Sequence, residues 1–201
     1  MTFEIQARQR QVQGSGASRR LRREHRVPAI VYGGASAPLL IDIDHNDILL
    51  NLGKEAFHSS VLTLKVDGTA QSVVLRDSQM HPWKRQVLHC DFQRVDATHA
   101  IHQRVPLHFV NAEIAPGVKI GGGAVSHILN EIDVICLPQD LPPFIEVDLK
   151  DLQAGHALHV SELVFPPGVK PVMHGDEDPV VASIPAKKGG AAAEGGDAAA
   201  S

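Results

Sequence analysis

The segment VLTLKVDGTAQSVVLR, residues 61–76, carries the strongest local signal in the chain. Two runs of aliphatic and β-branched residues flank the pair Asp67-Gly68. Asp-Gly is favoured at the centre of a type I′ turn, because both central residues of that turn need a positive φ angle. The segment therefore predicts a β-hairpin with strands over residues 61–66 and 69–76.

Further strands are expected on both sides of this hairpin. Ser18 is a candidate N-cap for a helix from residue 19 to about 26 that Pro28 ends, and Asp44 is a candidate N-cap for a helix through residue 52. Alternating or continuous apolar runs predict additional strands at residues 3–7, 29–32, 39–43 and 87–95. Six strands and two short helices suit a small β-barrel, so we expect a mainly β fold.

The second half of the 201-residue chain is also rich in short β-type runs, separated by Pro and Gly. We expect a barrel domain over residues 1–96 and a second β-rich domain over residues 97–185. Residues 186–201 are mostly Ala and Gly, which predicts a disordered tail. The strands expected in the second domain are 104–110, 125–129, 132–137, 144–148, 156–160 and 180–184.

The net charge of −4 conceals two halves of opposite sign. Residues 1–96 carry 13 Lys and Arg against 10 Asp and Glu, whereas residues 97–201 carry 6 against 13. Seven of the arginines lie within residues 1–30. This distribution favours a nucleic-acid partner for the first half, and a protein partner or solvent for the second.

Several classes of protein are excluded by the sequence. No apolar run approaches the length of about 18 residues that a membrane helix needs, and residues 1–10 lack the apolar segment of a secretory signal. Cys90 and Cys136 form no CxxC pair, and the P-loop, GxSxG and HExxH motifs are absent. We expect a cytoplasmic protein that is not an enzyme, with no cofactor, metal site or membrane partner.

The arginines form the first group of candidate RNA-binding residues. On a helix, Arg19, Arg22, Arg23 and Arg26 would share one face, with Arg20 beside them. Arginine binds phosphate through its planar guanidinium, and so many like charges repel one another unless an anion neutralises them. This pattern favours polyanion binding over a merely solvated basic surface.

Two further groups are weaker signals. Alternation in strand 87–93 puts His89, Asp91 and Gln93 on one face, although alternation alone favours an ordinary polar strand face. Residues 79–85 combine basic side chains with Trp83, which would contact RNA or equally well cover one end of the barrel. The complete set of candidate RNA-binding residues is Arg10, Arg19, Arg20, Arg22, Arg23, Tyr32, Gln79, Lys84, His89 and Asp91.

As a set, several segments closely resemble the bacterial large-subunit ribosomal proteins that bind 5S ribosomal RNA, in their longer two-domain form, the Ctc or general-stress type. The resemblance implies a six-stranded barrel that binds 5S ribosomal RNA in the loop E region, with contact or signature positions at Arg10, Arg19, Arg20, Arg22, Tyr32, Gln79, His89 and Asp91. Ser15 departs from the lysine that is frequent in the family's glycine loop. The segments are GSGASRRLR (14–22), VPAIVYGG (27–34), QMHP (79–82), HCDF (89–92), PGVK (116–119), FIEVD (144–148) and LVFPPGV (163–169).

Other functions remain open from the sequence. The acidic half would suit a stress-responsive module that binds a protein, and the barrel would suit recognition of transfer RNA. The histidines admit a metal-dependent hydrolase, although carboxylate or cysteine ligands at matching spacing are missing. If the chain belongs to the ribosome, neighbouring large-subunit proteins are candidate partners for residues 97–185.

Overall fold

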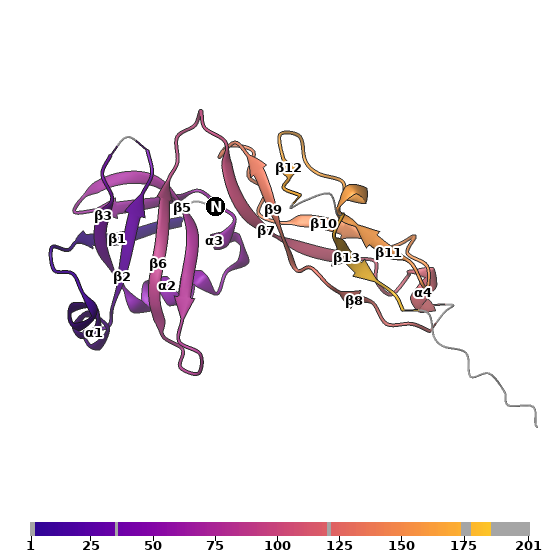
Figure 1. The fold of residues 1–201 in the computed structure, drawn as a ribbon, viewed down its shortest axis with the longest axis horizontal. Coiled ribbons are helices and arrows are strands. Elements are labelled where there is room, and N and C mark those ends of the chain that lie inside the picture. Colours follow the sequence, from indigo (N-terminus) through magenta and orange to yellow (C-terminus); the bar gives the residue numbers. More distant parts are fainter. Residues whose placement is uncertain (1–2, 35, 120–121, 174–177, 186–201) are drawn as a thin grey trace, which may run out of the picture.

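The computed structural model describes residues 3–34, 36–119, 122–173 and 178–185, which form two β-rich units side by side (Figure 1). The expected disordered tail, residues 186–201, lies outside the described residues. None of the helices in the described part of the chain has the length and hydropathy needed to cross a membrane.

The N-terminal unit is a closed barrel with the strand order β1-β3-β2-β6-β5-β4. Pairs β1–β4 and β2–β6 are parallel, and the other neighbouring pairs are antiparallel. Closure leaves the barrel without an edge strand, so its ladder hydrogen bonds are satisfied internally. The strands are β1 (Phe3–Gln9), β2 (Arg26–Tyr32), β3 (Leu39–Asp44), β4 (Leu62–Val66), β5 (Thr69–Met80) and β6 (Val87–Arg94).

The predicted hairpin is confirmed as β4 and β5. Asp67 and Gly68 have φ angles of 48° and 91°, so both central residues are in the left-handed region that a type I′ turn requires. Strand β5 continues to Met80, beyond the predicted end at residue 76, and pairs with β6 along that extension. This extension places Gln79 within the sheet.

Three helices accompany the barrel, where two were predicted. Helix α2 (His45–Leu52) begins as expected, because the Asp44 carboxylate accepts the amide hydrogens of Asn46 and Asp47. The additional helix α3 (Glu55–His58) is a single turn that buries Phe57 in the barrel core.

The boundaries predicted for the arginine helix were wrong. Helix α1 spans Ser15–Arg23, so Ser18 lies inside it and is not its N-cap. It ends because His25 adopts a left-handed φ of 56° and turns the chain into β2. Pro28 is therefore a strand residue paired with Asp42, not the helix terminator.

The second unit packs two small sheets around one core. The sheet order β10-β7-β9-β12 comprises β7 (Ile101–Val110), β9 (Glu131–Cys136), β10 (Ile145–Asp148) and β12 (Lys170–Pro171). The other sheet, β11-β13-β8, comprises β8 (Ser126–His127), β11 (Ala157–His159) and β13 (Val180–Ser183). Strand β12 and helix α4 (Pro116–Lys119) were not predicted. A short 3-10 turn, η1 (Val160–Glu162), follows β11.

Side chains join the two units. The Gln103 amide of β7 donates to the carbonyl oxygens of His58 (2.6 Å) and Leu75 (2.9 Å). The Ser59 hydroxyl donates to the Pro143 carbonyl at 2.6 Å. Val74, which points out of the barrel, is fully buried within the core of the second unit. These contacts hold the barrel against the first strand of the second unit.

Candidate RNA-binding face

Helix α1 and the hairpin of β5 and β6 lie at the same end of the barrel, the lower end in Figure 1. The Arg22 guanidinium joins them, because its Nε and Nη2 both donate to the Leu88 carbonyl of β6, at 3.1 and 2.9 Å. His89 is the next residue along β6. The arginine helix and the polar strand face, predicted from separate segments, therefore meet at this point.

The exposed arginines of α1 are free to bind an external anion. Arg19, Arg20 and Arg23 are exposed, and none of their guanidinium groups has a hydrogen bond or ion pair with another described residue. The helix also has no acidic residue in its first turn. Three uncompensated guanidinium groups on nine residues create a local positive field that favours phosphate.

Arg26 is not part of the predicted arginine face, because it lies in β2 and not in the helix. Its guanidinium forms an ion pair with the Asp42 carboxylate and also donates to the Asp42 carbonyl at 3.0 Å. Because this pair is mostly buried, Arg26 stabilises the barrel wall and is not displayed to a ligand. The expectation that Arg26 shares a face with Arg19, Arg22 and Arg23 was wrong, since His25 redirects the chain.

Arg10 faces a cavity of about 210 Å³ between α1 and residues 10–12. Its Nε is buried without a partner among the described residues, and its Nη1 makes only a long contact of 3.5 Å to the Val12 carbonyl. Desolvation lowers the pKa of Arg10 from its ordinary value, Asp42 opposes that shift, and Arg22 adds to it. A bound anion would supply the missing hydrogen-bond acceptor.

The strand face combines side chains from three neighbouring strands. Gln79 of β5 lies opposite His89, and on the other side of β6 Tyr32 of β2 lies beside Gln93. His89 and Asp91 share this face, as predicted, and His89 Nδ1 lies 2.6 Å from Asp91 Oδ1. With Nδ1–H donating to the carboxylate, the ring is held in one orientation and Nε2 is left for a ligand.

Tyr32 is a hydrogen-bond donor at neutral pH. Desolvation raises the pKa of its hydroxyl, and the negative charges of Asp91 and Asp77 raise it further against the opposing effect of Arg76. The face therefore offers a phenol, an amide, an imidazole and a carboxylate. Such a mixture of donors and acceptors suits base edges and ribose hydroxyls better than phosphates.

The loop between β5 and β6 displays the tryptophan to solvent. Trp83 is 82% exposed, so the alternative that it covers one end of the barrel was wrong. Its ring stacks on His81 with centroids 5.9 Å apart, and His81 Nδ1 accepts the amides of Trp83 and Lys84, each at 3.4 Å. The candidate set included Lys84 and omitted Trp83, although the sole tryptophan beside two cations was a usable signal.

Metal and thiol chemistry find little support on this face. Among the residues that the structure describes, no three His, Cys, Asp or Glu side chains are grouped closely enough to hold a metal ion. Cys90 points into the barrel, and burial, together with Asp91 and Asp77, raises the pKa of its thiol to about 12. The thiol is thus neither exposed nor ionised at neutral pH.

Comparisons with known proteins agree with this geometry. Residues 5–92 match the model of the ribosomal L25p family, and residues 100–188 match that of the C-terminal domain of ribosomal protein TL5. The chain is 57% identical to large ribosomal subunit protein bL25 of Dechloromonas aromatica, with all of both chains covered. It is 58% identical to the protein of the same name from Thiobacillus denitrificans, with 94% of this chain and 95% of that one covered.

Proposed function

The chain belongs to the bL25 family of large-subunit ribosomal proteins, and we propose on that premise that its barrel binds 5S ribosomal RNA at the internal loop called loop E. Membership in this family makes the chain a structural, non-catalytic component of the cytoplasmic ribosome. The observation that carries the RNA proposal is the junction at Leu88, where free arginines adjoin a polar strand face.

The arginines supply affinity. Arg19, Arg20 and Arg23 neutralise phosphates from the exposed side of α1. Arg10 donates to an anion at the cavity beneath the helix. Arg22 has two of its donors committed to Leu88, so it positions the helix and keeps its remaining Nη1 for RNA. Phosphate contacts of this kind fix orientation on the RNA and carry no sequence information.

The strand face supplies selectivity. An A-form helix has a major groove too narrow for side chains, and non-Watson–Crick pairs widen it. His89 and Asp91 read the edges of such pairs, and Gln79 and Tyr32 set the register on either side of them. Lys84 holds a phosphate at the hairpin tip, where Trp83 is free to stack on a base or a ribose.

A gel-shift titration of the full chain against 5S ribosomal RNA, over a series of salt concentrations, tests the phosphate contacts. Affinity falls as salt rises, and the double variant Arg19→Ala/Arg20→Ala should make this fall shallower. The magnitude of the slope of log affinity against log salt should decrease by about two, close to one per lost contact. The matched control is Lys150→Ala/Lys170→Ala, which removes two exposed cations from the second unit and should leave the slope unchanged.

The strand face is tested with His89→Ala and Asp91→Ala. Each should weaken binding to 5S ribosomal RNA about tenfold or more while binding to a random RNA duplex changes little, because only loop E presents edges to read. Equal losses on both RNAs would refute this role for the pair. Transfer RNA competing as well as 5S ribosomal RNA would instead favour a barrel specific for transfer RNA.

A further inference from the structure

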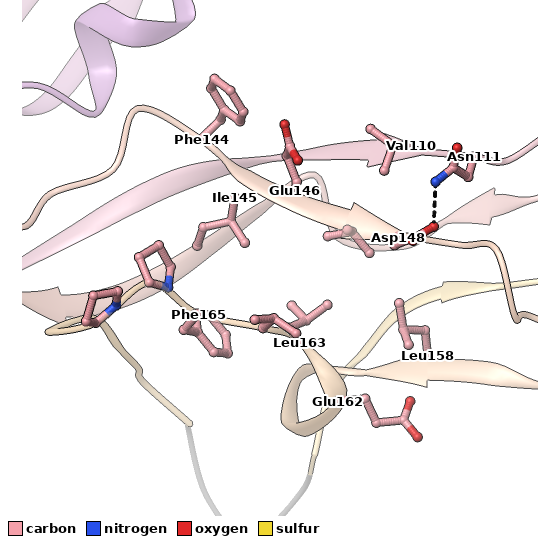
Figure 2. A pocket seen from close by; sticks show the side chains of 14 residues that line it. Val110, Asn111, Phe144, Ile145, Glu146, Asp148, Leu158, Glu162, Leu163 and Phe165 are labelled. Atoms are coloured by element: carbon pink, nitrogen blue, oxygen red, sulfur yellow. Dashed lines mark hydrogen bonds between the residues drawn. The ribbon is translucent and has the colours of Figure 1, made fainter.

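The second unit contains a groove of about 800 Å³ far from the arginine helix. One wall is formed by residues 144–148, which include strand β10, and the other by residues 162–167 (Figure 2). The floor of the groove is apolar: Figure 2 shows Ile145 directed toward Phe165 and Leu163, and both Ile145 and Leu163 are buried. Val164 is 85% exposed and Phe144 is 38% exposed, so apolar surface is left uncovered here.

The rim of the groove is acidic. Its 14 lining residues include Glu146, Asp148 and Glu162 and no Lys, Arg or His. The Asn111 side chain and the Lys150 amide donate to Asp148 and lower the pKa of its carboxyl, which therefore stays ionised. Glu146 has no hydrogen bond or ion pair with any described residue. A ligand here meets uncompensated negative charge.

The groove also exposes backbone that can pair. Strand β10 is the last strand of its sheet and pairs only with β7 among the described residues. The Leu149 amide donates to the Val110 carbonyl of β7, and by the alternation of a parallel ladder the backbone groups of Glu146 face the open edge. The opposite wall contains Pro166 and Pro167, which have no N–H to donate.

We propose that this groove binds an extended segment of another polypeptide that bears Lys or Arg and pairs with the open edge of β10 as an added strand. Alternate side chains of that segment enter the apolar floor, and the others place their cations beside Glu146 and Glu162. RNA is disfavoured by the acidic rim. Pairing with β10 of a second copy is disfavoured, because it brings like charges together.

The inference uses the proposed function only for the origin of the partner, which would be a basic segment of a neighbouring large-subunit protein. Binding of a peptide to the purified full chain needs no RNA. Failure of the peptide experiment would therefore leave the 5S ribosomal RNA proposal standing, and failure of the gel shift would leave the groove untouched.

The probe is a fluorescein-labelled synthetic peptide of alternating Lys and Val, ten residues long, titrated with the full chain by fluorescence anisotropy. The same peptide with Glu in place of every Lys should bind about tenfold more weakly or not at all. Two further versions carry N-methyl groups on every Val or on every Lys, so that each blocks one hydrogen-bonding edge. At least one of these should fail to bind.

The variant Glu146→Lys should weaken binding of the Lys-Val peptide about tenfold, and the effect should shrink as salt rises. The matched control is Asp47→Lys, which makes the same charge change at an exposed position of α2 on the barrel, and it should leave binding unchanged. The proposal is overturned if the Lys and Glu peptides bind equally, if both N-methylated peptides bind like the parent, or if the two variants behave alike.

Discussion

Both units of this protein are rich in β-strands, but the surfaces proposed to bind ligands carry opposite charge. The barrel is closed, so every strand has two partners, and external contacts are left to side chains, namely those of the polar strand face and those of α1 and the β5–β6 loop. The second unit contains two open sheets, and one of them leaves the edge of β10 unpaired among the described residues, beside a groove rimmed by carboxylates. Sheet closure and local charge together favour phosphate binding at the first surface and polypeptide binding at the second, as we propose.

The strongest test of this division removes a core side chain from one unit. Phe92 is fully buried in the barrel, so Phe92→Ala should cost about 3–5 kcal/mol of stability in denaturant unfolding followed by circular dichroism. RNA binding should be lost while the Lys-Val peptide still binds. The control Phe165→Ala, in the groove wall, should abolish peptide binding and leave RNA binding intact. Loss of both RNA and peptide binding in either variant would show that the units do not act separately.

Arg22 distinguishes support of the helix from contact with RNA. Arg22→Ala removes two hydrogen bonds to Leu88 and should cost about 1.5–3 kcal/mol of stability, since a charged donor is involved. Arg23→Ala removes an exposed cation that has no side-chain partner in the described part of the chain, so stability should change by less than about 0.5 kcal/mol while RNA affinity falls. Thermal unfolding and gel shifts on both variants measure the two effects, and identical stability losses would contradict the assignment.

Gly117 allows the second unit to be weakened without touching its charge. A Cβ at this position would lie 2.7 Å from the Ala154 amide nitrogen and 2.8 Å from the Gln153 carbonyl carbon, and backbone cannot easily move aside. Gly117→Ala should therefore cost about 1–3 kcal/mol and weaken peptide binding, with RNA affinity unchanged. Gly16→Ala has only the tip of Arg20 nearby, at 3.8 Å, and serves as the control in calorimetry.

Acid should loosen the second unit before the barrel. The pKa of Asp148 is lowered by hydrogen bonds from Asn111 and Lys150, and that of Asp178 chiefly by a hydrogen bond from Ser161. A lowered folded-state pKa gives stability that is complete above the ordinary carboxyl pKa and is lost as pH falls through the folded value. The effect is small, because Asp148 is exposed and the Asp178 side chain is 34% exposed. In a unit-resolved acid titration by NMR, Asp148→Asn should lessen this pH dependence.

The sequence predicted the features that depend on neighbouring residues. The hairpin at Asp67-Gly68 and the start of α2 at Asp44 were correct, because turn and cap chemistry act over two or three positions. The end of α1 was missed, since nothing adjacent marks His25 as left-handed. The partner of Arg26 was missed for a different reason: Asp42 becomes its neighbour only when β2 and β3 pair.

The candidate face shows the same limit. Alternation placed His89 and Asp91 together, but their 2.6 Å contact and the Gln79 register needed the sheet. The groove beside β10 could not be predicted from the sequence, because its walls come from segments 144–148 and 162–167, which become neighbours only in the fold. The only related signal in the sequence was the excess of acidic residues in the second half, which is consistent with a ligand that carries positive charge.

The two hydrogen bonds from Arg22 to Leu88 also bear on the entropy of RNA binding. A helix of nine residues with no side-chain cap would be largely unfolded as an isolated peptide. Docked on β6, it presents its arginines already ordered, so association does not have to fix their backbone at that moment. The protein has met that conformational cost during its own folding, which leaves more of each phosphate contact to appear as affinity.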